Sequence, residues 1–467
     1  MQSSHFPFRV FTAAVLVVLV VPTLIMDGMF MDGLLYTCVA KNLSEGLGTF
    51  WKPHYSATYL SFFDQQPPLG FAIQSIAFKI FGTSIYTARI YSFLTLCAGA
   101  FLITKIWSIL FKNEEGVRKT SWLPVLLWII IPVCSWAYSN NMLECTMVVF
   151  DLLAVLFLIK FTEKNFLPHL LLAGIFIFLA SLTKGFQGLF PLAALFFHWI
   201  AYRKHPFLKM VLNSAMLVAV PALIYLLVFQ IGEAREGLST YLNRRVWNSI
   251  ASVATVESRF YLAGRLFTEL LAPALLSGLA VILLKRKTGP EKKYPAHFIF
   301  FLLIGLSASL PLMITLEQRG FYLATSFPFF AIAIAALAAP YISGAIEKIN
   351  TEGRSSRIFN ILSVVLLCGA VLFSAFQIGK AKRNKTMLHD IYLIGEEIPK
   401  GSIASATPAL WHDWEFQEYF VRHFYISLDG NAVPSREFLI SEAQPEDTLY
   451  KRINIPTEKY NLYKAAK

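Results

Sequence analysis

The chain has 467 residues, of which 56% are hydrophobic and 15% are charged, and its formal net charge is +12 at pH 7. A soluble fold of this length would be far less apolar, so the composition excludes a soluble globular protein and predicts an α-helical polytopic membrane protein. Because most Lys and Arg stand in short clusters between apolar runs, the charge indicates topology and contact with membrane lipids, and we expect no nucleic-acid partner.

The five cysteines lie inside or beside apolar runs, without the CxxC or Cys/His spacing of a metal site and without a disulfide framework. Only scattered carboxylates could hold a divalent metal. We therefore expect no cofactor and no metal.

Spanning the hydrocarbon core takes about 20 apolar residues, and we predict about eleven spans. In chain order they cover residues 8–26, 84–111, 122–138, 144–161, 167–182, 187–202, 208–231, 266–284, 296–315, 321–341 and 358–378. No small-residue cleavage pattern follows the first span, so we interpret it as a retained signal anchor.

Alternate connections carry the positive charge, in segments such as KNEEGVRK, RKHPFLK and KRKTGPEKK. The three short turns of the opposite side hold only Lys184 and Arg319. The positive-inside rule then places the N-terminus in the cytoplasm and the C-terminus outside. We expect a multi-pass protein of a bacterial cytoplasmic (inner) membrane with a periplasmic C-terminal domain, acting as a monomer.

We divide the chain into a transmembrane catalytic domain, residues 1–379, and a small extracytoplasmic domain, residues 380–467. Two long outer connections, 27–83 and 232–265, belong to the first domain. Residues 380–467 contain equal numbers of basic and acidic residues and no further apolar span. In this segment MLHDIYLIGEEI and the stretch around WHDWEFQEYF are typical of helices, whereas HFYISL, EFLIS, TLYKRINI and YNLYK are typical of strands.

The first outer connection predicts two interfacial helices. In the first, Leu35, Val39, Leu43 and Leu47 form one stripe, so we expect this helix in the membrane interface with its polar face in water. The polar residues opposite the stripe are Lys41, Asn42, Ser44 and Glu45. A second helix is predicted between Pro68 and Gly82. Between them, FWKPHYSATYLSFF holds six aromatic residues, which indicates either an aromatic belt at the headgroups or a surface for sugar or lipid.

Two carboxylates follow the first span, in a repeated Met-Asp-Gly triplet. Asp27 stands at the end of the span, where a solvated carboxylate is ordinary. Asp32 begins the amphipathic helix, where the helix dipole also favours an acidic residue. A sugar transferase needs one base near the outer leaflet to accept the proton of an acceptor hydroxyl, and either residue could serve.

Basic residues predicted on the same outer side could bind a phosphate leaving group, since Arg is suited to bidentate contact with phosphate. They could equally pair with carboxylates or lipid headgroups. The residues are Arg89, Lys184, Arg244, Arg245, Arg259, Arg265 and Arg319. Glu144, which follows NNML at another outer turn, could order a base or could only cap its helix.

Two charged residues fall inside predicted spans, where an unpaired charge is costly. Lys105 is seven residues before Lys112, and Asp151 is nine before Lys160, so the two lie at similar depths. We therefore predict a structural ion pair between Lys105 and Asp151.

Four short motifs occur in order on the predicted outer side: DxxxY from Asp32 to Tyr36, QPPLG from Gln66, LTKG ending at Gly185, and RGFYL from Arg319. Together they resemble the bacterial GT-C glycosyltransferases, relatives of protein O-mannosyltransferases and lipid A aminoarabinose transferases. The resemblance covers roughly residues 8–345.

The resemblance implies transfer of a sugar from a polyprenyl-phosphate donor, on the outer face and with inversion at the anomeric carbon. It implies that Asp32 is the catalytic carboxylate and that an acidic partner lies before the prolines, where Asp64 is nearest. Asp27 remains the second candidate for the base. The donor phosphate would be bound by Lys184, Arg244, Arg245 and Arg319, and the acceptor or sugar by Tyr36, Tyr55, Gln65, Gln66, Glu144 and Tyr322.

The chain departs from the family pattern at three positions. Gly33 stands where the family often has Glu, Gln66 where it has Lys or His, and Leu35 where the aminoarabinose transferases have a basic residue. A neutral hexose or another modified sugar is therefore as compatible with the sequence as aminoarabinose.

We predict a glycosyltransferase that moves a hexosyl or pentosyl group to a lipid A or other glycolipid, a glycan or a protein. The alternative is a carrier or flippase for a lipid-linked sugar. Carriers usually place ionisable groups near mid-membrane and are built from repeats, whereas here the polar groups gather at one rim. A scaffold acting through its C-terminal domain would leave the four motifs unused.

Overall fold

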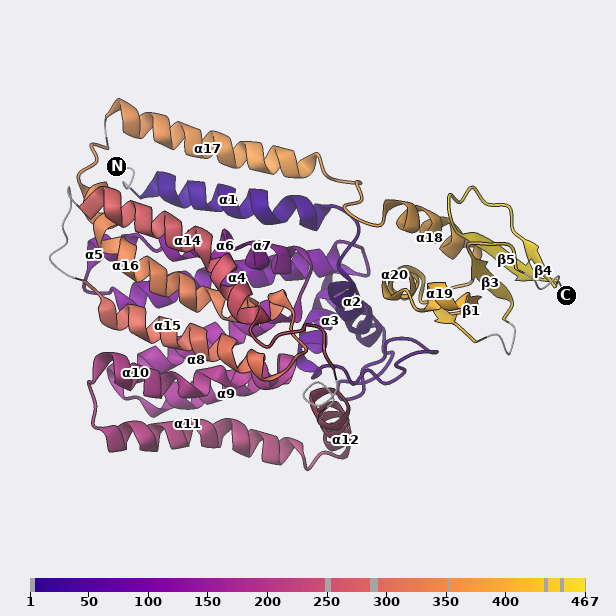
Figure 1. Cartoon of the computed structure of the whole chain (residues 1–467), viewed down its shortest axis with the longest axis horizontal. Coiled ribbons are helices and arrows are strands. Elements are labelled where there is room, and N and C mark those ends of the chain that lie inside the picture. Colours follow the sequence, from indigo (N-terminus) through magenta and orange to yellow (C-terminus); the bar gives the residue numbers. More distant parts are fainter. Residues whose placement is uncertain are drawn as a thin grey trace.

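The fold is described from a computed structural model, which covers residues 5–247, 253–285, 293–351, 353–431, 436–445 and 449–466. Part of the second outer connection and most of the KRKTGPEKK segment lie outside these residues. The described chain forms a bundle of long helices with a small α/β domain at one end (Figure 1).

Nine helices of the described residues are long and apolar enough to cross a membrane, or ten when a pair bent by 79° counts as one span. The bent pair is α6 (Trp122–Ile129) with α7 (Pro132–Ser139). The nine are α1 (Phe6–Ile25), α4 (Thr87–Leu110), α8 (Leu143–Lys164), the stretch Leu167–Tyr202, α11 (Phe207–Val228), α14 (Tyr261–Lys285), Pro295–Ile314, α16 (Phe327–Glu347) and α17 (Arg354–Ala375).

The stretch Leu167–Tyr202 turns back on itself. It consists of α9 (Leu167–Lys184), the 3-10 helix η1 (Gly185–Ala193) and α10 (Ala194–Tyr202). A Cβ on Gly188 would lie 2.5 Å from the carbonyl carbon of Ala180, whereas residues eight apart in a straight helix are separated by about 12 Å. With the two arms counted separately and the bent pair counted once, the described chain makes eleven crossings, as the sequence predicts.

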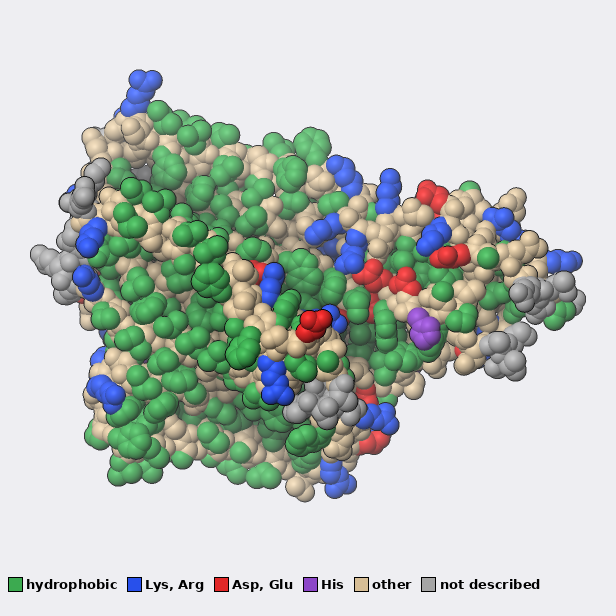
Figure 2. Space-filling view, in the orientation of Figure 1, with side chains coloured by type: hydrophobic (Ala, Val, Ile, Leu, Met, Phe, Trp, Pro, Cys, Tyr) green, Lys and Arg blue, Asp and Glu red, His purple; other side chains and the backbone are tan. Residues whose placement is uncertain are grey.

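The two ends of the bundle differ. At the end where the chain begins, here the basal end, lie α5 (Glu115–Lys119) and the turn between α10 and α11 (Figure 1). At the other end, the apical end, lie α2 (Met31–Ser44), α3 (Leu69–Phe81), α12 (Gly232–Thr240) and the C-terminal domain. Apolar side chains cover the lateral face between them (Figure 2). The chain is therefore a polytopic membrane protein.

The apical helices follow the predicted boundaries, but their surroundings differ. Helix α3 is preceded by Pro68 and closed by Gly82 at φ +75°, as predicted. In α2, Lys41 and Asn42 are 1% and 2% exposed, so the prediction that they face water is wrong. Helix α20 of the C-terminal domain packs against α2 and covers Lys41, whereas Asn42 donates hydrogen bonds to the carbonyl oxygens of His54 and Tyr55, at 3.1 and 2.8 Å.

The aromatic segment between α2 and α3 packs largely against protein. Tyr55 and Phe63 are buried, and the Tyr59 ring lies 5.8 Å and 5.0 Å from the rings of Trp411 and Trp414. These three of the six aromatic residues therefore form neither a headgroup belt nor an open binding surface, and Tyr59 fixes the C-terminal domain.

The C-terminal domain contains three helices beside a five-stranded sheet in the order β2-β1-β3-β5-β4. Strand β1 is parallel to β2 and β3, and β5 is antiparallel to β3 and β4. The elements are α18 (Lys385–Glu397), β1 (Ile403–Ala406), α19 (Pro408–Trp411), α20 (Trp414–Phe424), β2 (Ser427–Asp429), β3 (Phe438–Ser441), β4 (Tyr450–Arg452) and β5 (Asn461–Ala465). The first half of the predicted strand HFYISL is wrong, because α20 continues through Phe424.

Buried polar contacts dock this domain on the apical helices. Lys41 donates hydrogen bonds to the carbonyl oxygens of Arg422 and Val421, at 2.5 and 3.5 Å. The Arg422 guanidinium donates to the carbonyl oxygens of Thr83 and Ser84, at 3.0 and 2.7 Å. Because these groups are withdrawn from water, each bond is costly to lose.

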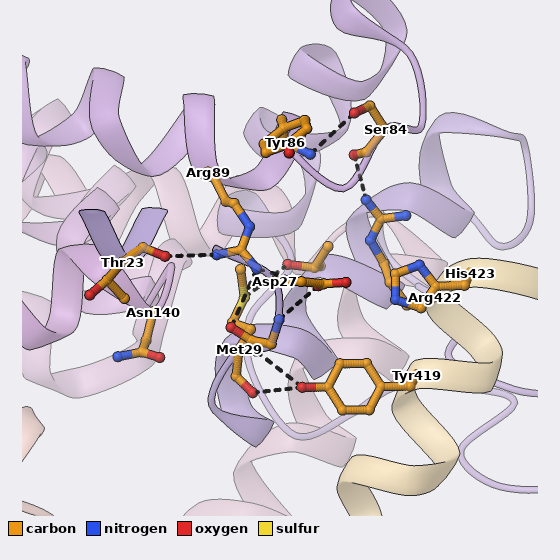
Figure 3. A network of polar contacts seen from close by, with 12 residues as sticks. Thr23, Asp27, Met29, Ser84, Tyr86, Arg89, Asn140, Tyr419, Arg422 and His423 are labelled. Atoms are coloured by element: carbon orange, nitrogen blue, oxygen red, sulfur yellow. Dashed lines mark hydrogen bonds and ion pairs between the residues drawn. The ribbon is translucent and has the colours of Figure 1, made fainter. Parts of the chain in front are cut away.

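Asp27 belongs to this docking region (Figure 3). Its carboxylate accepts a hydrogen bond from the Tyr392 hydroxyl at 2.7 Å and lies 3.8 Å from the Arg89 guanidinium. Its backbone pairs with Lys380 and Lys382 of the linker that follows α17. Asp27 therefore joins the end of α1 to the C-terminal domain, and Arg89 is engaged there as well.

The predicted ion pair between Lys105 and Asp151 is wrong. Asp151 is fully buried, and its carboxylate oxygens have no hydrogen-bond partner among the described residues. Lys105 is exposed on the side of α4, with its Nζ 5.3 Å from the centroid of the Phe101 ring. The two residues do not meet, because Lys105 lies on an exposed face of α4 and Asp151 on a buried face of α8.

We expect the docking of the C-terminal domain to strengthen as pH rises from 7. Burial, together with the nearby Arg422 guanidinium, lowers the pKa of Lys41 from 10.5 to about 7. Between these values the unfolded chain binds a proton that the folded chain does not, so stability increases with pH across this window. The melting temperature should rise from pH 7 to pH 9, and the rise should shrink in Lys41→Met but not in the exposed control Lys385→Met. An equal rise in both variants would contradict this assignment.

Candidate active site

The position of Asp32 depends on how α2 meets the turn between α7 and α8. The Phe30 N–H donates to Oδ1 of Asn140, and the Asn141 side chain donates to Oγ1 of Thr37, both at 3.1 Å. A Cβ on Gly33 would lie 1.8 Å from the carbonyl oxygen of Asn140. Only glycine permits this approach, which explains why the Glu of the family pattern is missing here.

Asp32 lies in the first turn of α2, half-buried and without a hydrogen-bond partner among the described residues. Burial raises the pKa of its carboxyl. Lys184, Arg319 and Arg245 oppose this rise, and Glu317 adds to it. The charges of three of the predicted phosphate-binding residues, which come from distant parts of the chain, therefore act on Asp32.

Two of those cations are paired with buried carboxylates. Lys184, at the end of α9, forms an ion pair with Glu144 in the first turn of α8. Arg245, on the π-helical segment η2 (Tyr241–Trp247), forms one with Glu317. Lys184 also lies 5.0 Å from the centroid of the Tyr322 ring. The pairs hold the cations in place and leave less of their charge for a ligand.

Arg319 differs from Lys184 and Arg245. It is exposed, and it forms no ion pair with any described residue. It precedes the 3-10 helix η4 (Gly320–Thr325), which carries Tyr322. Arg319 is thus the cation of this group most available to an anionic ligand.

Asp64 is buried beside η2. Its Oδ1 accepts a hydrogen bond from the Gln65 side chain at 2.8 Å, and its Oδ2 lies 3.4 Å from Nη1 of Arg244, whose side chain is 74% exposed. Since Arg244 and Arg245 are adjacent, one segment contacts both Asp64 and the surroundings of Asp32. The structure thus brings these predicted residues to the same end of the bundle.

The remaining predicted residues are placed as follows. Tyr36 is buried one turn after Asp32, and burial raises the pKa of its hydroxyl, with Asp32 and Glu144 raising it further. Gln66 is half-buried before Pro67. Tyr55 is instead fully buried toward the C-terminal domain, with its hydroxyl near Glu418, so its ring is not open to an acceptor.

Sequence reasoning missed two carboxylates near Asp32. Glu317 stands two residues before the RGFYL motif that begins at Arg319, and this proximity is the sequence signal that could have identified it. Glu418 of α20 is 1% exposed, and its Oε2 has no hydrogen-bond partner among the described residues. Burial raises the pKa of Glu418, and the charge of Asp32 raises it further. No sequence pattern connects residue 418 with residue 32.

Two cavities lie beside the group of charged residues around Asp32. One, of about 180 Å³, is lined mainly by apolar side chains including Phe186, Leu189 and Tyr241, and it borders Gly185 directly after Lys184. The other, of about 320 Å³, is lined by Trp136, Phe321 and Arg265 among others. In the described parts of the chain, no group of three or more His, Cys, Asp or Glu side chains could hold a metal ion.

Residues 65–231 match the family model described as dolichyl-phosphate-mannose-protein mannosyltransferase. No curated protein matches the chain.

Solved structures match over much more of the chain. The crystal structure of ArnT from Cupriavidus metallidurans bound to undecaprenyl phosphate matches with a TM-score of 0.67 at 14% identity, over 97% of both chains. Its apo structure gives 0.65 at 13% identity, over 97% of this chain and 96% of that one. The apo oligosaccharyltransferase of Archaeoglobus fulgidus gives 0.53 at 14% identity, over 91% of this chain and 64% of that one.

The chain therefore has the fold of ArnT over almost its whole length. The resemblance to GT-C glycosyltransferases predicted from the sequence is confirmed at the level of the fold.

We expect Glu144→Gln to destabilise the bundle strongly. It would leave the Lys184 ammonium, 8% exposed, without its counter-charge, which costs roughly 3–5 kcal/mol for a buried pair. The matched control is Glu163→Gln on the same helix, which removes an exposed pair with Lys112 and should cost about 1 kcal/mol or less. Thermal unfolding in detergent measures both, and the double variant Glu144→Gln/Lys184→Met should recover part of the loss. Equal effects of the two single variants would contradict a buried pair.

Proposed function

We propose that this chain is a glycosyltransferase that transfers a sugar from a polyprenyl-phosphate donor to an acceptor hydroxyl or amine, at the apical end of the bundle and with inversion. The observation that carries the proposal is Asp32. It is a carboxylate with no hydrogen-bond partner among the described residues, and the positive charges of Lys184, Arg245 and Arg319 act on it. The ArnT-like fold and the mannosyltransferase model support the same reaction class.

In the proposed reaction, Asp32 accepts the proton of the acceptor while the acceptor atom bonds to the anomeric carbon. The bond between that carbon and the phosphate oxygen breaks at the same time, and its electrons leave with the phosphate. The donor phosphate is a singly charged diester, and the released polyprenyl phosphate is a monoester with more negative charge. Cations near the leaving oxygen therefore stabilise the transition state more than they stabilise the bound donor.

Each polar group of the site then has a role. Arg319 contacts the phosphate directly, while Lys184 and Arg245 add positive potential from positions held by Glu144 and Glu317. Asp64, oriented by Gln65 and Arg244, orients the acceptor or the base. Gln66 and Tyr322, both half-buried, contact the sugar in this proposal, whereas Tyr36 is buried one turn after Asp32.

The apolar cavity beside Gly185 suits the first isoprene units of the donor. Its lining by Phe186, Leu189 and Tyr241 is apolar, and it opens beside the cation cluster. A lipid tail in this cavity would leave the phosphate at the level of Lys184. The cavity beside Phe321 and Arg265 is then available to the acceptor.

We propose that the apical end faces the outside of a bacterial cytoplasmic membrane. The basic connections at the basal end support this orientation through the positive-inside rule. The N-terminus would then be cytoplasmic, and the C-terminal domain would be periplasmic.

We expect Asp32→Asn to lower the rate of transfer by roughly 10²- to 10⁴-fold, because loss of a general base has this size of effect. The purified protein is incubated with a radiolabelled polyprenyl-phosphate sugar and membrane lipid extract. Asp27→Asn is the matched control, because Asp27 contacts Tyr392 and Arg89 and this proposal gives it no part in the transfer; it should lose activity only in proportion to lost stability. Transfer at the wild-type rate by the Asp32→Asn variant would contradict the assignment of Asp32 as the base. Absence of both transfer and hydrolysis with every donor would favour a carrier.

We also expect the pH dependence of transfer to report on Arg319. Its positive charge opposes the rise in the pKa of Asp32, so Arg319→Gln should raise this pKa further. The base is active when ionised, and the fall in kcat/KM on the acid side should therefore move to higher pH. Arg259→Gln, which removes an exposed cation at the same end, should leave the acid side unchanged. An identical pH profile for wild type and Arg319→Gln would contradict this placement.

A further inference from the structure

A groove at the basal end lies far from the candidate active site. It has a volume of about 810 Å³ and runs between α1, α4, α5 and α6. Its walls contain three cationic residues, Arg9, Arg118 and Lys119, together with apolar residues such as Leu16, Phe101 and Val125. No step of the proposed glycosyl transfer uses these residues.

The cations gather at one end of the groove. Arg9 lies in the first turn of α1, and Arg118 and Lys119 end α5. Burial and the charges of Arg9 and Lys119 lower the pKa of His5 to about 4, so both cations act on the same small region. Lys119 pairs with Glu115 at 2.8 Å, whereas Arg9 and Arg118 form no ion pair with a described residue. The rim therefore carries a net positive charge.

The apolar part of the groove follows the helices away from this rim. Leu16 stands seven residues after Arg9 on α1, which is about 10 Å along the helix axis. The Phe101 side chain is 58% exposed on the lateral surface. The groove thus has the form that a lipid needs, with cations at the level of the headgroup and an apolar wall below them.

Lys105 adds a fourth cation to this region. Its Nζ lies 5.3 Å from the ring of Phe101, which lines the groove, and it forms no ion pair with a described residue. A lysine inside a span is costly unless it reaches an anion or the interface. Asp151 is buried elsewhere and does not neutralise Lys105, so the Lys105 ammonium is available to an anion from outside the chain.

We propose that this groove binds an anionic phospholipid of the basal leaflet, with its phosphate between Arg9 and Arg118 and an acyl chain against Leu16 and Phe101. Basic pockets between membrane helices bind such headgroups through charge. The cation excess favours a lipid with two phosphates, and the apolar wall excludes a free phosphate as the occupant. The binding needs no assumption about the glycosyl transfer.

The first test measures lipid binding by native mass spectrometry of the full-length protein titrated with cardiolipin, phosphatidylglycerol or phosphatidylcholine. We expect anionic lipids to bind more tightly than phosphatidylcholine. Each basic residue near a lipid surface contributes about 1 kcal/mol, so Arg9→Gln/Arg118→Gln should weaken cardiolipin binding by about thirtyfold. The control Arg203→Gln/Lys204→Gln removes two exposed cations of the same end outside the groove and should not weaken it.

The second test locates the lipid and does not depend on the double variant folding. Trp122 lines the groove, so phosphatidylglycerol with brominated acyl chains should quench its fluorescence. The quenching should be weaker in Trp122→Phe and in Lys105→Gln, and weaker with brominated phosphatidylcholine. Equal quenching by both lipids would overturn the proposal, as would displacement by polyprenyl phosphate at lower concentration than cardiolipin, which would assign the groove to the carrier lipid.

Discussion

The candidate active site depends on the position of α2, which is held from three sides. The turn between α7 and α8 contacts its first residues through Asn140 and Asn141, and the close approach at Gly33 leaves no space for a side chain. Helix α3 packs along it, and α20 of the C-terminal domain covers its polar face. Asp32 can remain without a hydrogen bond because its helix, and not its own side chain, is anchored.

The same arrangement explains the unusual number of charges around Asp32. A carboxylate in a half-buried position is destabilised by lost hydration, and Lys184, Arg245 and Arg319 compensate for that loss. Those cations would repel one another if Glu144 and Glu317 did not pair with two of them. The three cations and the three carboxylates are therefore close to balanced in charge. In the transfer proposed above, the departing phosphate adds negative charge, and Arg319, exposed and without an acidic partner among the described residues, is the cation most available to it.

The sequence predicted those features that depend on position along a helix. Apolar length predicted the crossings, the Pro and Gly signals predicted α3, and placement on one side predicted that Lys184, Arg245 and Arg319 would gather near Asp32.

Prediction from the sequence failed where the result depends on the direction in which a side chain points around its helix, or on burial by a segment that is distant in the sequence. Lys105 and Asp151 are predicted at similar depths because depth follows from the rise per residue along a helix. The direction in which each side chain points depends on how its helix is rotated in the bundle, and only the packing shows that rotation. Lys41 and Asn42 have an amphipathic pattern typical of a solvent-exposed face, but Lys41 is buried against α20, nearly 380 residues later, and Asn42 against the segment that holds His54 and Tyr55. Strand β1 was missed because Ile403–Ala406 is short and built of small residues, without the β-branched alternation of most strands.

The positions at which the chain departs from the family pattern can be explained from their surroundings in this fold. A glutamate at position 33 would collide with the carbonyl oxygen of Asn140, so a second carboxylate beside Asp32 cannot come from the same helix. The acidic neighbours of Asp32 are instead Glu317, before η4, Glu144, in α8, and Glu418, in α20. Leu35 likewise stands in place of a basic residue, and the cations arrive from α9, η2 and the segment before η4. In the family pattern, one stretch of sequence supplies these charged residues, whereas here separate segments supply them. The site should therefore be compared with those of similar proteins by the positions of its residues in space.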